Sequence, residues 1–313
     1  MLTSLLVSEP MNRSVAVIIP VRNGAQTVAQ AVNSVLSQTH PATEIIVIDD
    51  NSSDSTPEIL GKFGSKIKVL KGFGLGAGPA RNLGIEAAKS EYIAFLDADD
   101  IWIPEKLESQ LPYLDEGVIV GAYAKYVSGP KFKRVGSSIR TIDDDEANLM
   151  LRRREGMPAL LSTWVIKKSD IEKYGLFDPM YLVAQDYEFL MRHVSAGLRM
   201  VVIRKELARY LIHMSSETAR TYIQQYLTAH YVKKDIQGTL GLDLDTWLNQ
   251  AEKQKIMKSA RAGYYFRKAL VATGSARTYH QVLLNAAFSA FLNPKDFIWK
   301  FRRQGPSFRS SAK

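Results

Sequence analysis

Four short apolar runs alternate with segments of helical character over the first hundred residues. The apolar runs, rich in β-branched residues, span residues 14–21, 43–50, 66–72 and 91–100. Segments with apolar residues at helical spacing, or with helix-start signals, fill the intervals at 23–39, 53–63 and 79–89. Strict alternation of this kind is typical of βαβ units, which build a parallel sheet with helices on both faces. We therefore predict an α/β fold with a mostly parallel central sheet flanked by helices.

Three of these predicted strands run directly into segments with polar or turn-forming residues. Pro20 and Val21 end the first strand, Asp49 and Asp50 end the second, and residues 97–100 (DADD) end the fourth. Because the carboxyl ends of parallel strands lie at one edge of a sheet, ligands of such folds bind there. The sequence therefore predicts that three distant segments converge on one ligand site.

The pattern changes after about residue 110. The apolar spacing predicts a strand over 118–127, a strand and a short helix within 159–175, a helix over 185–197 and a strand within 198–213. From about residue 221 the strand signal fades and long amphipathic segments follow, which predict a helical C-terminal extension.

Composition indicates a soluble globular protein of a reducing compartment. Hydrophobic residues make up 46% of the 313 residues, and there is no cysteine. Disulfides and thiolate metal sites are therefore excluded. No run approaches the roughly 18–20 apolar residues of a membrane span, and the first 14 residues lack the pattern of a secretory signal. We predict a cytoplasmic protein.

The net charge of +9 is concentrated in the C-terminal tail. Residues 295–313 contain six Lys or Arg and one Asp, and aromatic residues are interleaved with them. Such a tail suits an anionic membrane surface, so we predict a peripheral contact with the inner face of the membrane. A solvated, disordered tail is the alternative. No nucleic-acid motif accompanies the tail, and no nucleic-acid partner is expected.

The acidic segment at the end of the fourth strand is the strongest chemical signal. Asp97 and Asp99 flank Ala98, and residues i and i+2 of an extended segment point to the same side. Two carboxylates on one side suit Mg²⁺ or Mn²⁺, which prefer oxygen ligands and often bind phosphate oxygens as well. The same pattern also occurs in turns and helix caps, so the metal site is one of two readings of these residues.

Two longer stretches of sequence favour a metal site at Asp97 and Asp99. The segments "VIIPVRNGAQTVAQAVNSVLSQTHPATEIIVIDDNSSDST" and "GAGPARNLGIEAAKSEYIAFLDADDIW" closely resemble the family 2 glycosyltransferases in order and spacing. The resemblance covers roughly residues 14–215. It implies the GT-A fold and an inverting, metal-dependent hexosyltransferase that uses a nucleotide-sugar, with Mn²⁺ or Mg²⁺ as cofactor.

The resemblance also implies a domain division. Residues 1–13 would be an N-terminal extension and 14–220 the GT-A domain, with a nucleotide-binding half at 14–110 and an acceptor half at 111–220. Residues 221–313 would form the helical C-terminal region with the basic tail.

By the same resemblance, the donor nucleotide contacts residues from all three strand ends. Asp50 would accept a hydrogen bond from the base, while Asp49 would hold the loop. Arg81, placed in the first turn of its helix, would reach the base or the phosphates, where a helix N-terminus also favours anions. Asp97 and Asp99 would hold the metal. The full implied nucleotide-binding set is Pro20, Val21, Arg22, Asn23, Asp50, Arg81, Asp97 and Ala98.

The acceptor half needs a general base, because a sugar hydroxyl must lose its proton as it attacks the anomeric carbon. Asp186 matches the family's acidic position before an apolar helix, and Gln185 stands where the family often has Glu. A helix cap is the alternative role for Asp186. His213 and Arg209 match a segment that closes over the diphosphate, so both are candidates for phosphate or metal contact. A purely structural His213 is equally compatible with the sequence.

By the same resemblance, the expected reaction moves a sugar from a nucleotide-diphosphate sugar, with UDP as the expected nucleotide, to a hydroxyl of a saccharide or lipid-linked acceptor in polysaccharide or glycoconjugate biosynthesis. Two alternatives stay open: a sugar-phosphate nucleotidyltransferase, and a non-catalytic nucleotide-fold scaffold at the membrane surface. A nicotinamide oxidoreductase is disfavoured, because Ala77 interrupts the GxGxxG spacing and the chain has no GxxxxGK.

Overall fold

The computed structural model describes most of the first 213 residues. The described residues are 13–128, 133–137, 144–153 and 157–213, together with 216, 221, 224, 225, 228, 229, 232 and 258. The predictions for residues 1–12, for most of the helical C-terminal region and for the basic tail concern residues outside this set.

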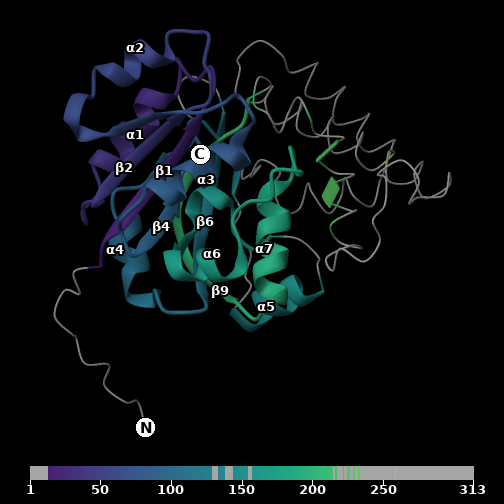
Figure 1. Cartoon of the computed structure of the whole chain (residues 1–313). Helices are drawn as coiled ribbons and strands as arrows, with labels where there is room; N and C mark the ends of the chain where they lie inside the picture. Colours follow the sequence, from purple (N-terminus) through teal and green to yellow (C-terminus); the bar gives the residue numbers. More distant parts are fainter. Residues whose placement is uncertain are drawn as a thin grey trace, which may run out of the picture.

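One sheet organises the described part of the chain (Figure 1). Its strands are β1 (Val15–Val21), β2 (Glu44–Asp49), β3 (Lys68–Lys71), β4 (Tyr92–Phe95), β5 (Ile101–Trp102), β6 (Val118–Ser128), β7 (Lys133–Ser137), β8 (Val165–Lys167) and β9 (Arg199–Leu211). They lie in the order β3-β2-β1-β4-β8-β6-β9-β5, and β7 pairs with β6. The strands β1, β2, β3, β4, β6 and β9 share one direction, which confirms the mostly parallel sheet.

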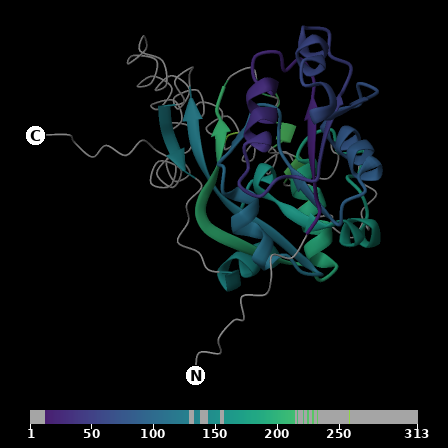
Figure 2. The same ribbon diagram turned by 90° about the vertical axis from the view of Figure 1, so that its left-hand side faces the viewer.

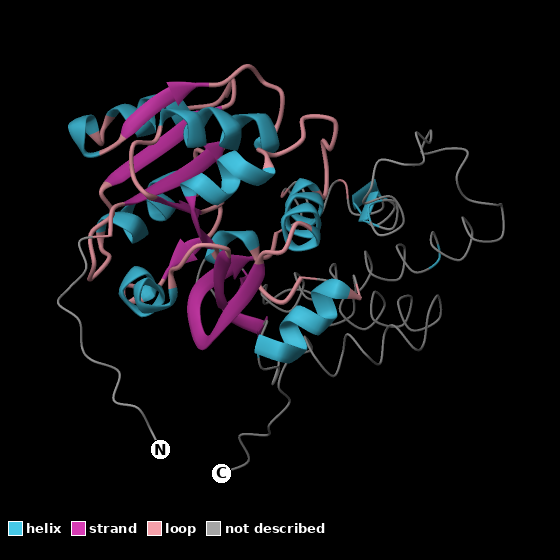
Figure 3. Cartoon of the chain, turned by 60° about the horizontal axis from the view of Figure 1, so that its bottom comes forward, coloured by secondary structure: helices cyan, strands magenta, loops and turns pink. Residues whose placement is uncertain are grey.

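Helices cover both faces of the parallel half (Figure 3). The α-helices are α1 (Val28–Leu36), α2 (Thr56–Gly61), α3 (Ala77–Ala87), α4 (Lys106–Gln110), α5 (Asp144–Arg152), α6 (Lys168–Tyr174) and α7 (Gln185–Ser195). Short 3₁₀ turns lie at Gly64–Lys66, Leu111–Tyr113 and Leu161–Thr163. Each strand and helix predicted before residue 213 is present.

The two faces of β1 belong to different cores. Val17 and Ile19 pack in a cluster with residues of α1, whereas Ile18 packs in a cluster with residues of α3. Successive strand residues point to opposite faces, so a continuous apolar run is what a strand covered on both faces requires. This burial fixes β1 at the centre of the parallel half, between β2 and β4.

The second half joins the first through an antiparallel strand. β8 pairs antiparallel with both β4 and β6, and β6 then pairs with β9 in parallel. The β6–β9 pairing shifts register on either side of Tyr123, and Figure 2 shows β9, in green, as a long curved strand. The curvature carries the end of β9 back toward the acidic segment after β4, where β9 also pairs with β5.

Helix α3 lies against the sheet at Gly84. A Cβ atom built on Gly84 would lie 2.7 Å from Cγ2 of Ile18 and 2.8 Å from Cδ1 of Ile48. Real Cβ atoms do not approach other heavy atoms this closely, so the absence of a side chain lets the helix sit directly on β1 and β2. This contact sets the height of α3, and therefore of Arg81 three residues earlier, above the sheet.

We predict that Gly84→Ala destabilises the protein by about 1–3 kcal/mol, because the added methyl group overpacks the contact with Ile18 and Ile48. Gly61→Ala is the matched control, since a Cβ at Gly61 meets no atom within 4 Å. Its unfolding free energy should be unchanged or higher by up to about 1 kcal/mol. Urea unfolding of the two variants decides the point: equal stability of both would contradict the close-packing account.

Candidate active site at the carboxyl edge of the sheet

The ends of β1, β2 and β4 lie side by side, as the sequence predicts. The Asp50 backbone N–H donates to the Val21 carbonyl at 2.8 Å, which joins the ends of β2 and β1. On the other side of β1, a Cβ atom built on Gly24 would lie 3.9 Å from the Cβ of Ala98. The loops after β1 and β4 are therefore in van der Waals contact. Three segments distant in the sequence form one edge.

The acidic segment after β4 is a turn, so the expectation of an extended segment is wrong. β4 ends at Phe95, and the Asp100 backbone N–H donates to the Asp97 carbonyl at 3.0 Å, which closes the turn. Asp97 and Asp99 consequently do not alternate as strand residues do. Each carboxylate has a partner of its own instead of sharing a side with the other.

Arg81 is the partner of Asp97. Its Nη2 lies 2.6 Å from Asp97 Oδ1, and Arg81 is only 4% exposed, whereas one third of the Asp97 side chain is exposed. The guanidinium also lies over the Phe177 ring, 5.4 Å from the centroid. Helix α3 begins at Ala77, two residues before Pro79, so Arg81 lies in the second turn and not in the first as predicted. Pro79 is tolerated there because the first backbone N–H groups of a helix have no intrahelical acceptor.

His213 is the partner of Asp99. Its Nε2 lies 2.9 Å from Asp99 Oδ2, and just under a third of each side chain is exposed. The sequence placed His213 at the phosphate or metal, and the structure brings it to the acidic turn. Arg209 is exposed on β9 and lies opposite Ile101 in the β5–β9 register. Ile101 directly follows the same turn in the chain.

Asp100 has a structural position that the sequence analysis did not recognise. It is 1% exposed, and its carboxyl accepts hydrogen bonds from the Ser162 hydroxyl at 2.5 Å and the Leu211 backbone N–H at 3.1 Å. Ser162 also accepts from the Asp97 backbone N–H at 3.2 Å, and its carbonyl accepts from the Trp102 indole at 2.7 Å. Burial, and then the nearby carboxylates, raise the pKa of Asp100 well above its usual value.

Asp50 holds the glycine-rich loop, a role that the sequence analysis gave to Asp49. The two Asp50 carboxylate oxygens accept the backbone N–H groups of Gly74 and Gly76, at 2.7 and 2.8 Å. Asp49 caps a shorter turn by accepting the Ser52 N–H at 3.0 Å. Asp50 is 3% exposed. Each carboxylate oxygen has two lone pairs, so a contact from Asp50 to a base stays a prediction.

Among the residues predicted at the end of β1, Pro20 and Val21 are buried and Arg22 and Asn23 are exposed. Asn23 adopts a positive φ of 54° and its side-chain oxygen accepts the Ser53 N–H at 2.8 Å, which shapes the loop. Arg22 Nη1 lies 3.4 Å from the Gly74 carbonyl. The β1 loop and the glycine-rich loop are therefore neighbours on the same edge.

Asp186 enters this edge from the acceptor half, at the start of α7. The cap position is Ala184, with a left-handed φ of 54°, so Asp186 lies within the first turn and does not cap the helix. Its Oδ1 accepts the Tyr187 backbone N–H at 2.8 Å. Burial raises the pKa of Asp186, and the positive charge of Arg81 opposes that rise. Asp186 is thus electrostatically coupled to the Arg81–Asp97 pair.

Gln185 connects Arg81 to the acceptor half. With its amide oriented to satisfy both groups, Gln185 accepts from Arg81 Nη1 at 3.1 Å and donates to the Leu182 carbonyl at 3.2 Å. Gln185 is neutral, so its contact with Arg81 adds no negative charge to that of Asp97.

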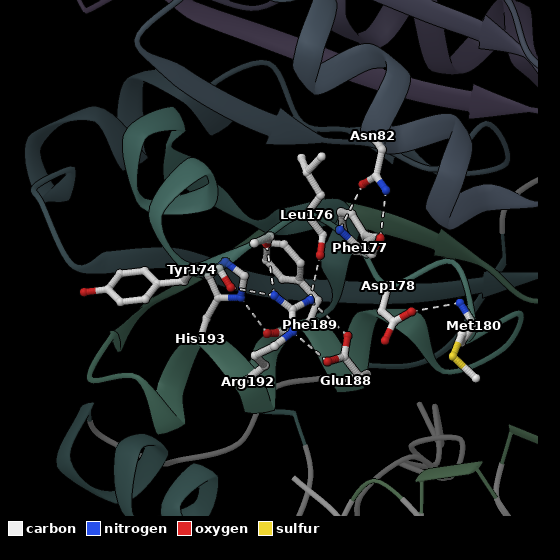
Figure 4. Close-up of polar contacts among 11 residues, drawn as sticks. Asn82, Tyr174, Leu176, Phe177, Asp178, Met180, Glu188, Phe189, Arg192 and His193 are labelled. Atoms are coloured by element: carbon white, nitrogen blue, oxygen red, sulfur yellow. Dashed lines mark hydrogen bonds and ion pairs between the residues drawn. The ribbon is translucent and has the colours of Figure 1, made fainter. Parts of the chain in front are cut away.

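The loop before α7 is fixed by two clamps (Figure 4). Arg192 donates to the carbonyls of Tyr174 and Leu176, both at 2.7 Å, and its Nε pairs with Glu188 at 2.7 Å. Asn82, the residue after Arg81, makes two hydrogen bonds with the Phe177 backbone, at 2.7 and 2.9 Å. Phe177 is thereby held beneath the Arg81 guanidinium.

The described residues contain no group of three or more Asp, Glu or His side chains arranged to hold a metal ion. Asp99 and His213 form a pair that offers one carboxylate and one imidazole. Mg²⁺ commonly takes only one or two protein carboxylates and completes its coordination with phosphate oxygens and water. The pair therefore fits a metal that arrives with a diphosphate, whereas Asp97 Oδ1 is already bonded to Arg81.

We predict that Asp100→Asn stabilises the fold at neutral pH but not at acid pH. The folded-state pKa of Asp100 lies above the unfolded value, so ionisation of this carboxyl costs stability as the pH rises through the folded pKa. The amide keeps both contacts, accepting from Leu211 and donating to Ser162. Thermal unfolding between pH 4 and pH 8 measures the difference. Asp115→Asn, at an exposed carboxylate, is the control, and an equal shift for both variants at every pH would contradict the prediction.

The match to known families covers the half of the chain that carries most of this edge. The model of "Glycosyl transferase family 2" matches residues 16–175, just over half of the chain. An uncharacterized glycosyltransferase of Rickettsia bellii is 42% identical over 115 residues, which are 36% of this chain and 16% of that protein. The chain spans less than a fifth of the length of this relative.

A second relative matches over a longer stretch. The Escherichia coli protein WfaP, a UDP-Glc:alpha-D-GlcNAc-diphosphoundecaprenol beta-1,3-glucosyltransferase, is 28% identical over 210 residues, which are 66% of this chain and 81% of that protein. Among solved structures, residues 1–349 of S. aureus TarS in complex with UDP-GlcNAc superpose with a TM-score of 0.57 at 20% identity, covering 90% of this chain and 82% of TarS. This likeness shows the GT-A fold, and with the family match the chain belongs to glycosyl transferase family 2.

Proposed function

We propose that this protein transfers a sugar from a nucleoside diphosphate sugar to a hydroxyl group, with inversion at the anomeric carbon. One observation carries the proposal: on a family 2 fold, the buried Arg81 pairs with Asp97 and is close enough to the candidate base, Asp186, to influence its pKa. A cation for the diphosphate and a base for the acceptor are the two groups that such a transfer requires.

The donor would lie across the ends of β1 and β2, under the glycine-rich loop. The diphosphate would approach Arg81, which is held in place by Asp97 and Gln185. Asp50 orders the loop through Gly74 and Gly76, so that backbone can lie close to the nucleotide. WfaP is named as an enzyme that uses UDP-Glc, which supports uridine as the base of the donor.

Asp186 would act as the general base. Its carboxylate takes the proton of the acceptor hydroxyl while the hydroxyl oxygen bonds to the anomeric carbon. The bond from that carbon to the diphosphate oxygen breaks on the opposite face, and the nucleoside diphosphate leaves. Because burial raises the pKa of Asp186, its carboxylate is a stronger base than that of an exposed aspartate.

We predict that Asp186→Asn lowers kcat by about 10²–10⁴-fold, the usual contribution of a general base. Asparagine is isosteric and can still accept the Tyr187 N–H, so binding of the nucleotide-sugar should change by less than about threefold. Asp178→Asn, at a half-exposed carboxylate in the loop before α7, is the control. A variant Asp186→Asn that turns over at the wild-type rate would remove the base assignment.

We also propose that Mn²⁺ or Mg²⁺ is held by Asp99 with His213, rather than by Asp97 and Asp99 as the sequence suggested. The paired positions of the two side chains and the engagement of Asp97 by Arg81 support this choice. A bound dication would stabilise the charge that develops on the departing diphosphate. His213 also ties the residues after β9 to the acidic turn, with or without a metal.

If this is correct, Asp99→Asn should abolish the increase in UDP affinity caused by added Mn²⁺. Affinity without metal should be nearly unchanged, because Arg81 is untouched. Calorimetric titration of UDP with and without Mn²⁺ measures both values, and Asp115→Asn serves as a remote control. The same metal effect in wild type and Asp99→Asn would show that Asp99 is not a ligand.

We propose that the acceptor is a saccharide carried on a lipid diphosphate, as is the acceptor named for WfaP. Within the described residues, no helix is long and apolar enough to cross a membrane. We propose a cytoplasmic enzyme that works peripherally at the inner face of the membrane and takes part in polysaccharide or glycoconjugate assembly.

The two alternatives predict different products. A sugar-phosphate nucleotidyltransferase would release pyrophosphate, whereas a glycosyltransferase releases a nucleoside diphosphate. A non-catalytic scaffold would release neither. Incubation of purified protein with UDP-sugars, Mn²⁺ and a lipid-linked acceptor, followed by analysis of the released phosphates, distinguishes the three.

A further inference from the structure

The four most exposed large apolar side chains of the described residues lie on only two loops. Phe73 and Leu75, in the glycine-rich loop after β3, are 78% and 58% exposed. Met180 and Leu182, in the loop before α7, are 87% and 61% exposed. Single exposed apolar residues are ordinary, but four of this size on two loops at one site point to a binding surface.

The two loops lead into helices that are neighbours at the first turn of α3. A Cβ atom built on Gly78 would lie 3.7 Å from the Gln185 Cγ, so α3 and the start of α7 lie side by side there. Leu75 precedes Gly78 by three residues. Leu182 precedes Gln185 by three residues, and its carbonyl accepts the Gln185 amide. The apolar side chains therefore flank the edge that holds Arg81 and Asp186.

Both loops have ordered backbones that hold these side chains out. Asp50 accepts the N–H groups on either side of Leu75, from Gly74 and Gly76. In the other loop, Asp178 accepts the Met180 N–H at 2.9 Å. Figure 4 shows the Met180 side chain directed away from the Asn82–Phe177 clamp. The apolar groups are thus presented by fixed turns.

Two exposed cationic residues lie beside the first loop. Lys71 is the last residue of β3, the edge strand that leads directly into the loop. Arg22 is exposed as well, and its Nη1 lies 3.4 Å from the Gly74 carbonyl. In the second loop, the half-exposed Asp178 has one carboxylate oxygen on the Met180 N–H. Exposed apolar side chains beside exposed cations match an anionic lipid surface, which offers both an apolar interior and negative headgroups.

We propose that loops 73–75 and 180–182, together with Lys71 and Arg22, form a membrane-binding face that rests on anionic lipid. Phe73, Leu75, Met180 and Leu182 enter the interface between headgroups and acyl chains. The active-site edge then opens toward the bilayer. This face is separate from the basic tail. The inference deepens the proposed function, on which it rests only for the reason why the site would face a lipid-linked acceptor.

Vesicle co-sedimentation of the full chain tests the proposal. Wild type should bind vesicles of phosphatidylglycerol and phosphatidylcholine, and the combined change Phe73→Ser, Leu75→Ser, Met180→Ser and Leu182→Ser should weaken binding at least about tenfold. The matched control removes two exposed apolar side chains elsewhere, Tyr113→Ser with Leu149→Ser, and should change binding by less than about twofold.

A second variant tests the charge. Lys71→Gln should weaken binding to the same vesicles by about fivefold, and added salt should reduce the difference from wild type. Lys68→Gln is the matched control: its Nζ lies on the Ala87 carbonyl at the other end of β3, and binding should change by less than about twofold. Far-UV circular dichroism and thermal unfolding of every variant should match those of wild type, which shows that the proteins are folded.

Two results would overturn the proposal. Either wild type fails to bind the vesicles, or the four-serine variant binds them as tightly as wild type does. In the second case, a loss of UDP affinity would assign the loops to the donor site, and a change from dimer to monomer would assign them to a second copy of the chain. Vesicle binding needs no turnover, so a protein that binds lipid as predicted but transfers no sugar would refute the proposed function and leave this inference standing.

Discussion

The ion pair between Arg81 and Asp97 is the interaction on which the site depends. The guanidinium is almost fully buried, and its Nη2 lies 2.6 Å from the carboxylate. Removing one partner of such a pair leaves an uncompensated charge, which typically costs about 3–5 kcal/mol. The pair joins α3 to the segment after β4, and Gln185 extends the connection to α7. One cation therefore links α3, the segment after β4 and α7.

Three carboxylates within four residues, 97–100, repel one another unless each is stabilised by a partner at this edge. The structure gives each carboxylate a different partner. Asp97 is paired with an arginine, Asp99 with a histidine, and Asp100 is buried with a serine hydroxyl and a backbone N–H. The charge that must stay near solvent is thereby confined to Asp97 and Asp99, each about one-third exposed. Those two are the carboxylates that a diphosphate or its counter-ion could reach.

The strands, the helices and the convergence of the strand ends were predictable from the sequence. Buried runs and helical spacing are local signals, and the parallel arrangement follows from their alternation. The conformation of the acidic turn was not predictable, because it depends on Ser162 and Leu211, which are 62 and 111 residues away from Asp100. A lone serine in an apolar segment gives no signal of its own. The loop-holding role of Asp50 is likewise visible only once Gly74 and Gly76 are placed in space.

The central claim is that this edge binds the diphosphate of a nucleotide-sugar through Arg81. Calorimetric titration of UDP into wild type and Arg81→Gln tests it most directly, with far-UV circular dichroism to confirm that the variant is folded. The account predicts measurable binding by wild type and at least about a tenfold loss of affinity in the variant, the cost of one charge-assisted contact. Equal affinity for the two folded proteins, or no nucleotide binding by wild type, would contradict it.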